Sequence, residues 1–468
     1  MPAEAAFGEG AAATLDLRVP QRIHVIGVGG AGMSAIALVL RAMGHTVSGS
    51  DLKDSPVADR LRSHGITVAV GHRAENVAGA DAVTYSPAVP PENVELAEAR
   101  ALGIRVAARS EVLAAICATR RCLAVAGTHG KTTTASMLSL ILVEAGLRPS
   151  FVIGADVNEI GTNAVWDTGE WLVVEADESY GTFKALRPDV AVLTSVEADH
   201  LDYYGTFDVL REAFARFVDM ATEGAIFCAD DAEAAAIGGA RGAIGVGMAE
   251  GATYRMTEVE QNRSWTSFVL RTAQGELGPV RVGVPGIHNA RNAAVATVAA
   301  LQVGAPFGAA QAALARFAGV TRRFEFRGEV RGVTFVDDYA HLPGEVRVAL
   351  ATARTGGWDR VVAVFQPHRF SRTAALADQF GTAFGQADEL VVTDVYSAGE
   401  RPVPGVSGRL VVDAIREQDP RLPVAYAPGW EELRRTVASV LRPGDLCLTL
   451  GAGDLTMLPD ELLESPEW

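Results

Sequence analysis

The sequence has few cysteines, no excess of basic residues and no long hydrophobic run. Its 468 residues include four cysteines, Cys117, Cys122, Cys228 and Cys447, and no Cys-x-x-Cys pair, so it predicts neither a disulfide framework nor a zinc site. Asp and Glu number 57 against 41 Lys and Arg, and the formal charge of -16 argues against binding to nucleic acid or an anionic membrane. No apolar run is long enough for a membrane span. We expect a cytoplasmic protein with reduced thiols, no nucleic-acid partner and no membrane.

The composition is typical of a soluble globular protein, with 49% hydrophobic and 21% charged residues. The length exceeds one ordinary core. Short apolar segments alternate with amphipathic ones, which is the α/β pattern of parallel sheets. Residues 1–20 are rich in Ala, Gly and Glu and lack a basic region, which predicts a disordered tail and not a signal peptide. We expect domains at 21–120, 121–321 and 322–468.

Apolar segments mark the strands that we expect in each domain. Between residues 253 and 284 the residues alternate in character and Gly turns appear, which predicts a small antiparallel flank to the central sheet. The expected parallel strands are Arg22–Ile26 and Thr46–Gly49 in the first domain, Cys122–Ala126, Trp171–Glu175, Val190–Val196 and Ala225–Ala229 in the second, and Gly332–Val336, Arg360–Phe365, Glu389–Thr393 and Leu446–Leu450 in the third.

The segment Gly127–Thr134 reads Gly-Thr-His-Gly-Lys-Thr-Thr-Thr, between an apolar strand and a helix expected over Thr132–Ala145. Glycines let backbone N–H groups surround phosphate oxygens, the lysine reaches the terminal phosphates, and the hydroxyl after it suits Mg²⁺. The segment differs from a standard P-loop because two residues, instead of four, separate its first glycine from Gly-Lys, and Val125 stands where the outer glycine would be. The alternative is an ordinary Gly-rich turn. We favour a phosphate loop.

A second glycine motif, Gly27-x-Gly29-x-x-Gly32, follows the first expected strand, and Asp51 stands where a ribose-binding acid belongs. The pattern predicts a diphosphate at the start of a helix. It does not distinguish NAD from another diphosphate nucleotide such as a UDP-sugar, and a tight turn with no ligand is also possible.

Carboxylates gather where two central strands end. Glu175, Asp177 and Glu178 follow one strand, and Glu197, Asp199 and His200 follow the other. Since ligands bind at the carboxyl ends of parallel strands, Glu175 and His200 are candidates to complete a magnesium site with Thr132. Asp177 and Glu178 fit equally well as solvated loop acids.

Cationic and amide side chains follow in the last third of an otherwise acidic chain. Asn289 and Asn292 suit a purine edge or phosphate, and Arg323 suits a phosphate, whereas Arg322 fits a surface salt bridge better. Asp338 and His341 follow one strand, and His368, Arg369 and Arg372 follow another, which suits an anionic substrate. His341 has a packing role as its alternative.

These motifs together resemble the Mur ligases over residues 23 to about 458. The resemblance rests on Gly-Val-Gly-Gly-Ala-Gly-Met-Ser (27–34), Gly-Thr-His-Gly-Lys-Thr-Thr-Thr (127–134), Glu-Ala-Asp-Glu-Ser (175–179), Glu-Ala-Asp-His (197–200), His-Asn-Ala-Arg-Asn (288–292), Arg-Arg-Phe (322–324), Asp-Asp-Tyr-Ala-His (337–341) and Gln-Pro-His-Arg-Phe-Ser-Arg-Thr (366–373). It implies three α/β domains: a Rossmann-like N-terminal domain, a central P-loop ATPase-like parallel sheet with a small antiparallel flank, and a Rossmann-like C-terminal domain.

The resemblance also implies the substrates and the residues that hold them. The branch that it indicates joins UDP-N-acetylmuramate to L-alanine, with ATP and Mg²⁺, through an acyl phosphate, in peptidoglycan precursor synthesis. We expect a monomer or weak homodimer. The implied contacts are, for ATP, Gly127, Thr128, Gly130, Lys131, Thr132, Thr133, Asn289, Asn292, Arg323 and Asp338; for the metal, Thr132, Glu175 and His200; for the UDP-sugar, Gly29, Gly30, Gly32, Ser50, Asp51, His72, Ser86 and Arg109; for the amino acid, His368, Arg369 and Arg372; and for catalysis, Lys131, His200, Arg323 and His341.

The chain departs from the family pattern at Tyr180-Gly181, where relatives often have Asp-Ala or Asp-Gly, and at Leu342, where a second histidine is common. No lysine occurs between Asp202 and Val218, where sibling ligases that add later amino acids carry a carbamylated lysine. The alternatives are a ligase that recycles a murein tripeptide onto the same sugar nucleotide, a nicotinamide oxidoreductase, and a nucleotide-binding regulator without catalysis.

Overall fold

The computed structural model describes residues 15–86 and 88–465. Cα packing divides the chain into two compact units. One comprises Met1–Val259, Phe268–Arg281 and Arg291–Phe317, and the other comprises Glu260–Ser267, Val282–Ala290 and Ala318–Trp468. The first 14 residues of the expected tail lie outside the described residues. In the rest of it, Leu15 and Leu17 are buried in a hydrophobic core, 7% and 5% exposed.

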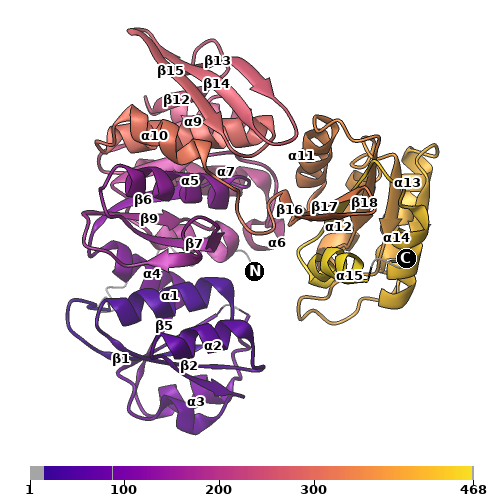
Figure 1. Ribbon diagram of the computed structural model, residues 1–468. Coiled ribbons are helices and arrows are strands. Elements are labelled where there is room, and N and C mark those ends of the chain that lie inside the picture. The colour runs from indigo at the N-terminus through magenta and orange to yellow at the C-terminus, as the bar shows by residue number, and fades with distance from the viewer. Residues whose placement is uncertain (1–14, 87, 466–468) are drawn as a thin grey trace. The chain divides into compact units, whose positions relative to one another are not determined.

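The first sheet is wholly parallel and has the strand order β3-β2-β1-β4-β5. Helices cover it on both sides (Figure 1). The order reverses between β1 and β4, so the loops after these strands diverge and leave room for a ligand at the carboxyl edge. Its elements are β1 (Arg22–Ile26), α1 (Ala31–Ala42), β2 (Thr46–Asp51), α2 (Pro56–Ser63), β3 (Thr67–Val70), η1 (Ala74–Val77), β4 (Ala82–Tyr85), α3 (Val94–Ala101), β5 (Arg105–Ala108) and α4 (Arg109–Cys117).

The central sheet has ten strands in the order β15-β14-β13-β12-β11-β10-β6-β9-β7-β8. Short connections join β13, β14 and β15, so these neighbours run antiparallel, as expected for residues 253–284. Its elements are β6 (Arg121–Ala126), α5 (Lys131–Glu144), β7 (Ser150–Val157), β8 (Thr162–Val165), β9 (Trp171–Glu175), η2 (Ser179–Ala185), β10 (Val190–Leu193), α6 (Leu201–Tyr204), α7 (Phe207–Asp219), β11 (Gly224–Cys228), α8 (Ala232–Gly239), β12 (Ile244–Gly247), β13 (Tyr254–Gln261), β14 (Thr266–Thr272), β15 (Gly275–Val282), α9 (Ile287–Gln302) and α10 (Phe307–Ala315).

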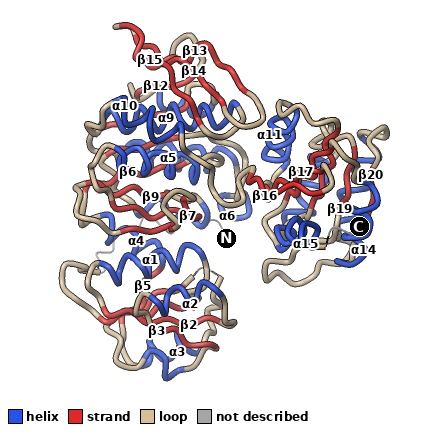
Figure 2. Tube along the Cα trace, in the orientation of Figure 1, coloured by secondary structure: helices blue, strands red, loops and turns tan. Residues whose placement is uncertain are grey.

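The third sheet has the order β16-β17-β21-β18-β19-β20, with β16 antiparallel to β17 and the other pairs parallel. Figure 2 shows its helices in blue around the red strands. One buried cluster joins the sheet to α11, α12 and α13, and another joins it to α14 and α15. The elements are β16 (Glu325–Val330), β17 (Val333–Asp338), α11 (Pro343–Arg354), β18 (Arg360–Phe365), α12 (Phe370–Phe380), β19 (Glu389–Val392), α13 (Gly408–Gln418), β20 (Val424–Tyr426), α14 (Trp430–Val440), β21 (Asp445–Leu450), η3 (Asp454–Met457) and α15 (Leu458–Glu464).

Each sheet has an aspartate directly before one strand that fixes the register with its neighbour. The carboxylate of Asp81, before β4, accepts a hydrogen bond from the backbone N–H of Arg22 in β1, and its own N–H donates to the Arg22 carbonyl. The same reciprocal pair occurs between Asp189, before β10, and Cys122, and between Asp388, before β19, and Val361. All three lie at the amino edge, so this edge sets the alignment of the strands.

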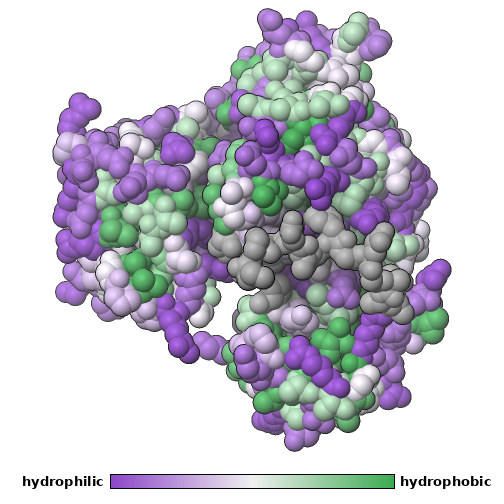
Figure 3. Space-filling view, turned by 180° about the vertical axis from the view of Figure 1, so that it is seen from behind, coloured by the Kyte–Doolittle hydropathy of each residue, from purple (hydrophilic) through white to green (hydrophobic). Residues whose placement is uncertain are grey.

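The structure confirms the α/β class with parallel sheets. Strands β1, β9 and β18 coincide with the predicted ranges. The prediction was wrong by one to three residues for other strands: β2 continues to Asp51 and β17 to Asp338, whereas β10 ends at Leu193. The strands that were not predicted are β3, β4, β5, β7, β8, β12, β16 and β20. On the face drawn in Figure 3, hydrophobic and hydrophilic residues are interspersed over the described surface. Within the described residues, every helix is too short or too polar to cross a membrane.

Candidate active site

The glycine turn after β1 brings together the side chains predicted to bind a sugar nucleotide. The Asp51 carboxylate accepts a hydrogen bond from the Gly29 N–H at 2.9 Å. A Cβ on Gly32 would lie 2.8 Å from the guanidinium carbon of Arg109, so a side chain there would displace this guanidinium. Ser86 lies beside Gly27 in the same way, with 3.2 Å between its Cβ and a Cβ built on that glycine. The cluster lies at the carboxyl ends of β1, β2 and β4.

The helices after the two glycine motifs begin without a side-chain cap. Gly30 precedes α1 and Gly130 precedes α5, and neither helix has a side-chain hydrogen bond at its N-cap. Their first backbone N–H groups are therefore available to an anion, and the helix dipole adds positive potential there. Gly130 has a φ of 79°, and a Cβ there would lie 2.5 Å from the Asn292 side-chain oxygen, so glycine is required.

Lys131, the first residue of α5, forms a nearly buried ion pair across the phosphate loop. Its Nζ lies 2.8 Å from a carboxylate oxygen of Glu178 and also donates to the Gly127 carbonyl at 2.6 Å. The side chains are 12% and 1% exposed. Burial alone would lower the pKa of Lys131, but Glu178, Asp177 and Glu175 outweigh it and raise that pKa. Lys131 is therefore charged, and its contacts with Gly127 and Glu178 hold its side chain over the phosphate loop.

The neighbouring carboxylates differ in how they are stabilised. Burial raises the pKa of Glu178, even with Lys131 beside it. Burial also acts to raise the pKa of Asp177, but Lys131 and hydrogen bonds from Ser179 lower it below its ordinary value. The loop after β9 thus carries an ionised Asp177 beside Glu178. Because Glu178 is buried, its ionised form is unfavourable unless a cation lies beside it.

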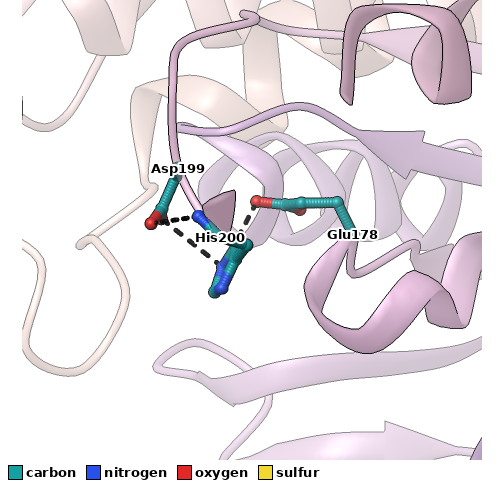
Figure 4. Close-up of side chains that lie close together, drawn as sticks. All are labelled: Glu178, Asp199 and His200. Atoms are coloured by element: carbon teal, nitrogen blue, oxygen red, sulfur yellow. Dashed lines mark hydrogen bonds and ion pairs between the residues drawn. The ribbon is translucent and has the colours of Figure 1, made fainter. Parts of the chain in front are cut away.

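Glu178 also belongs to a group with Asp199 and His200. The Nε2 atom of His200 lies 3.4 Å from an Asp199 oxygen and 3.9 Å from a Glu178 oxygen, and both carboxylates point toward the ring (Figure 4). Among the described residues, this is the one group of three His, Cys, Asp or Glu ligand atoms lying within 4.8 Å of one another. His200 has a φ of 52°, a left-handed conformation uncommon for residues other than glycine. The backbone is held in this conformation where the ring enters the cluster.

Thr132 and Glu175 meet as predicted. The Thr132 hydroxyl donates to one Glu175 oxygen at 2.9 Å, and the Gly154 N–H in β7 donates to the other at 2.7 Å. The sequence paired Glu175 with His200, whereas the structure surrounds His200 with Glu178 and Asp199. Glu178 therefore lies between Lys131 and His200 and links the phosphate loop to the ends of β9 and β10.

In the second unit, Asp338 is a buried acid at the end of β17. Its two oxygens accept hydrogen bonds from the N–H groups of Phe324 and Ala340, at 2.8 and 2.7 Å. Burial raises its pKa to about 6, although Arg323 and these two N–H donors act in the opposite direction. Arg323 lies over the Tyr339 ring, with its guanidinium carbon 5.1 Å from the ring centroid. Asp338 therefore orients the Arg323 segment.

The residues predicted to meet the amino acid form an aromatic and cationic cluster in this unit. The His368 ring lies 5.4 Å from that of His341 and stacks on Tyr396 at 5.8 Å. Burial lowers the pKa of His368 to about 3, and the nearby His341 and Arg372 add to the shift. Arg372 can only donate, so His368 Nδ1 accepts its hydrogen bond at 3.1 Å, and the neutral ring carries its proton on Nε2.

Asn289 and Arg322 each have a structural partner in the fold. The Asn289 side chain donates one N–H to the Pro285 carbonyl at 2.7 Å, at the start of α9. Arg322 was expected in a surface salt bridge. It is 21% exposed, donates to the carbonyls of Gly451 and Gly453, and lies 3.4 Å from buried Asp337. It therefore fixes the turn after β21.

Sequence reasoning missed one buried acid and left another undecided. Glu95, in α3, is fully buried and accepts a hydrogen bond from Ser50. No local motif marks it, because its partners come from other parts of the chain. Glu178 fitted a loop acid and a site residue equally well, and only its 1% exposure beside Lys131 distinguishes it.

Comparisons with known proteins agree with this arrangement along most of the chain. Three family models match: the Mur ligase family catalytic domain at residues 22–121, the Mur ligase middle domain at 125–300, and the Mur ligase glutamate ligase domain at 322–453. A UDP-N-acetylmuramate–L-alanine ligase from Saccharopolyspora erythraea is 46% identical over 462 residues, which cover 96% of this chain and 94% of that protein.

Solved structures show the same similarity. UDP-N-acetylmuramate-alanine ligase MurC from Thermotoga maritima has a TM-score of 0.81 at 27% identity, and the match covers 96% of this chain and 99% of that one. A murein peptide ligase from Psychrobacter arcticus has a TM-score of 0.71 at 25% identity, over 95% and 98% of the two chains. With the two glycine motifs, the Lys131 loop and the acidic strand ends in the order that was predicted, the chain belongs to the Mur ligase family.

Proposed function

We propose that the protein is an ATP-dependent ligase that joins the lactyl carboxylate of UDP-N-acetylmuramate to the amine of L-alanine and releases ADP and phosphate. The observation that carries this proposal is the ion pair between Lys131 of the glycine loop and the buried Glu178 carboxylate after β9, in a chain similar to ligases of that name. It would act in peptidoglycan precursor synthesis.

The reaction needs activation of a poor electrophile. A carboxylate oxygen of the sugar nucleotide attacks the γ-phosphorus of ATP, and ADP leaves. The amine then attacks the acyl carbon of the resulting acyl phosphate, and phosphate leaves with the bonding electrons. Lys131 and the uncapped start of α5 supply positive charge to the phosphates during the first step. Arg323 is proposed for the same task from the second unit.

The carboxylates of this site fit a divalent cation. Glu175, Glu178 and Asp199 are hard oxygen donors of the kind that Mg²⁺ prefers, the Thr132 hydroxyl adds another, and His200 is a less usual ligand for it. We propose that Thr132 and Glu175 hold one Mg²⁺ and that His200, with Glu178 and Asp199, holds a further cation. A bound cation would neutralise charge on the transferring phosphate.

The second unit supplies the residues proposed for the amino acid. Arg369 and Arg372 match its carboxylate, and neutral His368 offers its Nε2–H as a further donor. His341 lies against His368 and is held through its Nδ1, 3.0 Å from the Tyr339 carbonyl. We also propose a cytoplasmic location, because the four cysteines of the chain are free and buried. The proposed state is a monomer or weak homodimer, which light scattering would measure.

Phosphate release tests the proposal. The wild-type protein should release phosphate from ATP with UDP-N-acetylmuramate plus L-alanine, and release with glycine or L-serine measures specificity. Phosphate release only with a murein tripeptide, and not with L-alanine, would favour the recycling ligase instead. The similarity to the murein peptide ligase from Psychrobacter arcticus is the reason for testing this alternative. Lys131→Ala should abolish release while UDP-N-acetylmuramate binding persists. Loss of that binding as well would contradict the division of tasks between the two glycine motifs.

A further inference from the structure

A buried carboxylate lies behind the sugar-nucleotide cluster, at the start of α3. The Glu95 side chain is fully buried, and its Oε2 accepts a hydrogen bond from the Ser50 hydroxyl at 2.6 Å. The same oxygen lies 3.2 Å from His72 Nδ1 and 3.7 Å from His24 Nε2. Its other oxygen accepts from the Arg73 N–H and the Asn76 side chain. One carboxylate therefore joins β1, the end of β2, the loop after β3, and α3.

The position of Glu95 favours the ionised form. Asn93 caps α3 by accepting the N–H groups of Glu95 and Leu96, so the carboxylate sits in the first turn of that helix. Burial would raise its pKa, but the nearby His24 ring and the hydrogen bonds from Ser50 and Asn76 outweigh it and lower that pKa to about 2. A permanent anion is thus available to orient its donors.

These contacts restrict the His72 ring. Its Nδ1 lies 3.0 Å from the Ser50 hydroxyl oxygen, which itself donates to Glu95. The Ser50 oxygen therefore accepts from Nδ1–H, and Nε2 is left without a partner among the described residues. Only 14% of the side chain is exposed, so the ring has little freedom to turn. Ser50 lies at the end of β2 and His72 follows β3, so both lie at the carboxyl edge of the sheet, where parallel sheets bind ligands.

We propose that Glu95 is a positioning residue of the sugar-nucleotide site, which holds Ser50 and His72 so that His72 Nε2 meets the nucleoside half of the substrate. This inference rests on the proposed function, since it takes His72 as a sugar-nucleotide contact. Glu95 itself touches no substrate. It acts in the way that outer carboxylates orient the histidines of binding sites.

Glu95→Gln tests the role, because the side-chain amide has nearly the same shape but only one acceptor oxygen. If that oxygen keeps Asn76 and the Arg73 N–H, the NH₂ group faces Ser50 and His72 and cannot accept from them. We expect UDP to bind about tenfold more weakly by calorimetry, as for the loss of one charge-assisted hydrogen bond. The KM for the UDP-sugar should rise similarly, with kcat nearly unchanged.

A double-mutant cycle separates positioning from a structural role. If Glu95 acts through His72, then His72→Gln and the double variant should bind UDP as weakly as Glu95→Gln does, so that the effects do not add. Additive effects, or unchanged UDP binding in Glu95→Gln, would overturn the proposal. If Glu95→Gln does not fold, Glu95→Asp retracts the carboxylate by one methylene and serves in the same cycle.

Asp445→Asn is the matched control. Asp445 is also a buried carboxylate, 1% exposed and 2.7 Å from Arg360, but it lies at the amino edge of the third sheet. The Asp445→Asn substitution should lower the melting temperature of the protein without changing its affinity for UDP. If UDP affinity falls equally in this control, the effect of Glu95→Gln reflects stability alone. Failure of wild-type protein to bind UDP or UDP-N-acetylmuramate would instead contradict the proposed function.

Discussion

The ion pair between Lys131 and Glu178 makes a sharp prediction, because stability and activity respond differently to its removal. At 2.8 Å and an effective dielectric constant of about 20, two unit charges attract by about 6 kcal/mol. Desolvation of both ions offsets much of this, but removing one partner leaves the other buried alone, at a cost of about 3–5 kcal/mol. We expect Lys131→Met to lower the free energy of unfolding by about 3 kcal/mol, because Glu178 is 1% exposed.

The double variant Lys131→Met/Glu178→Gln should recover most of that stability, since no uncompensated charge remains. Neither variant should release phosphate from ATP. Glu178→Gln alone should cost less than Lys131→Met, because Lys131 keeps the Gly127 and Thr128 carbonyls as acceptors. Urea unfolding followed by tryptophan fluorescence measures all three. If Lys131→Met is as stable as the double variant, the pair does not compensate a buried charge and the reasoning fails.

Three further measurements test the charges that the structure assigns. The pKa of Glu95 is lowered to about 2 from an ordinary value of 4.5, which corresponds to about 3 kcal/mol of stability that is present above pH 4.5 and lost as the pH falls toward 2. Glu95→Gln should flatten that part of the curve of stability against pH. His368, with its pKa lowered to about 3, should show neutral-ring NMR signals down to about pH 4, with His368→Gln to assign them, and titration near 6.5 would contradict its buried environment. Chelation of divalent cations should stop phosphate release while UDP binding to the glycine turn persists, and His200→Ala should raise the Mg²⁺ concentration needed for half-maximal activity.

Much of the fold was predictable because apolar strands are bounded by polar or glycine residues. The ranges of β9 and β18 were predicted to the residue for this reason. Strand β2 extends past its last apolar residue to Asp51, since its parallel neighbours supply backbone partners whatever the side chain. Strand β16 was missed because it is exposed in part and interrupted by a bulge near Gly328.

The site residues, too, fall into those that the sequence predicts and those that only the structure reveals. Lys131 and Asp51 were found because each belongs to a motif with fixed spacing from neighbouring glycines. Glu95 was not, because its significance arises from burial against strands that are distant in sequence. Asn289 matches a ligand-binding pattern and also donates to the Pro285 carbonyl at the start of α9, a local hydrogen bond that composition cannot reveal.

The reciprocal aspartate pairs at the amino edges of the three sheets have a consequence for how such a protein can be altered. Each pair joins two strands before either reaches its loop, so the length of a strand sets the height at which its loop emerges. Two extra residues would raise a loop by about 6–7 Å and keep every side chain on its face, whereas one extra residue would turn the face over. Loops of this ligase are therefore exchangeable in steps of two residues, measured from Asp81, Asp189 and Asp388.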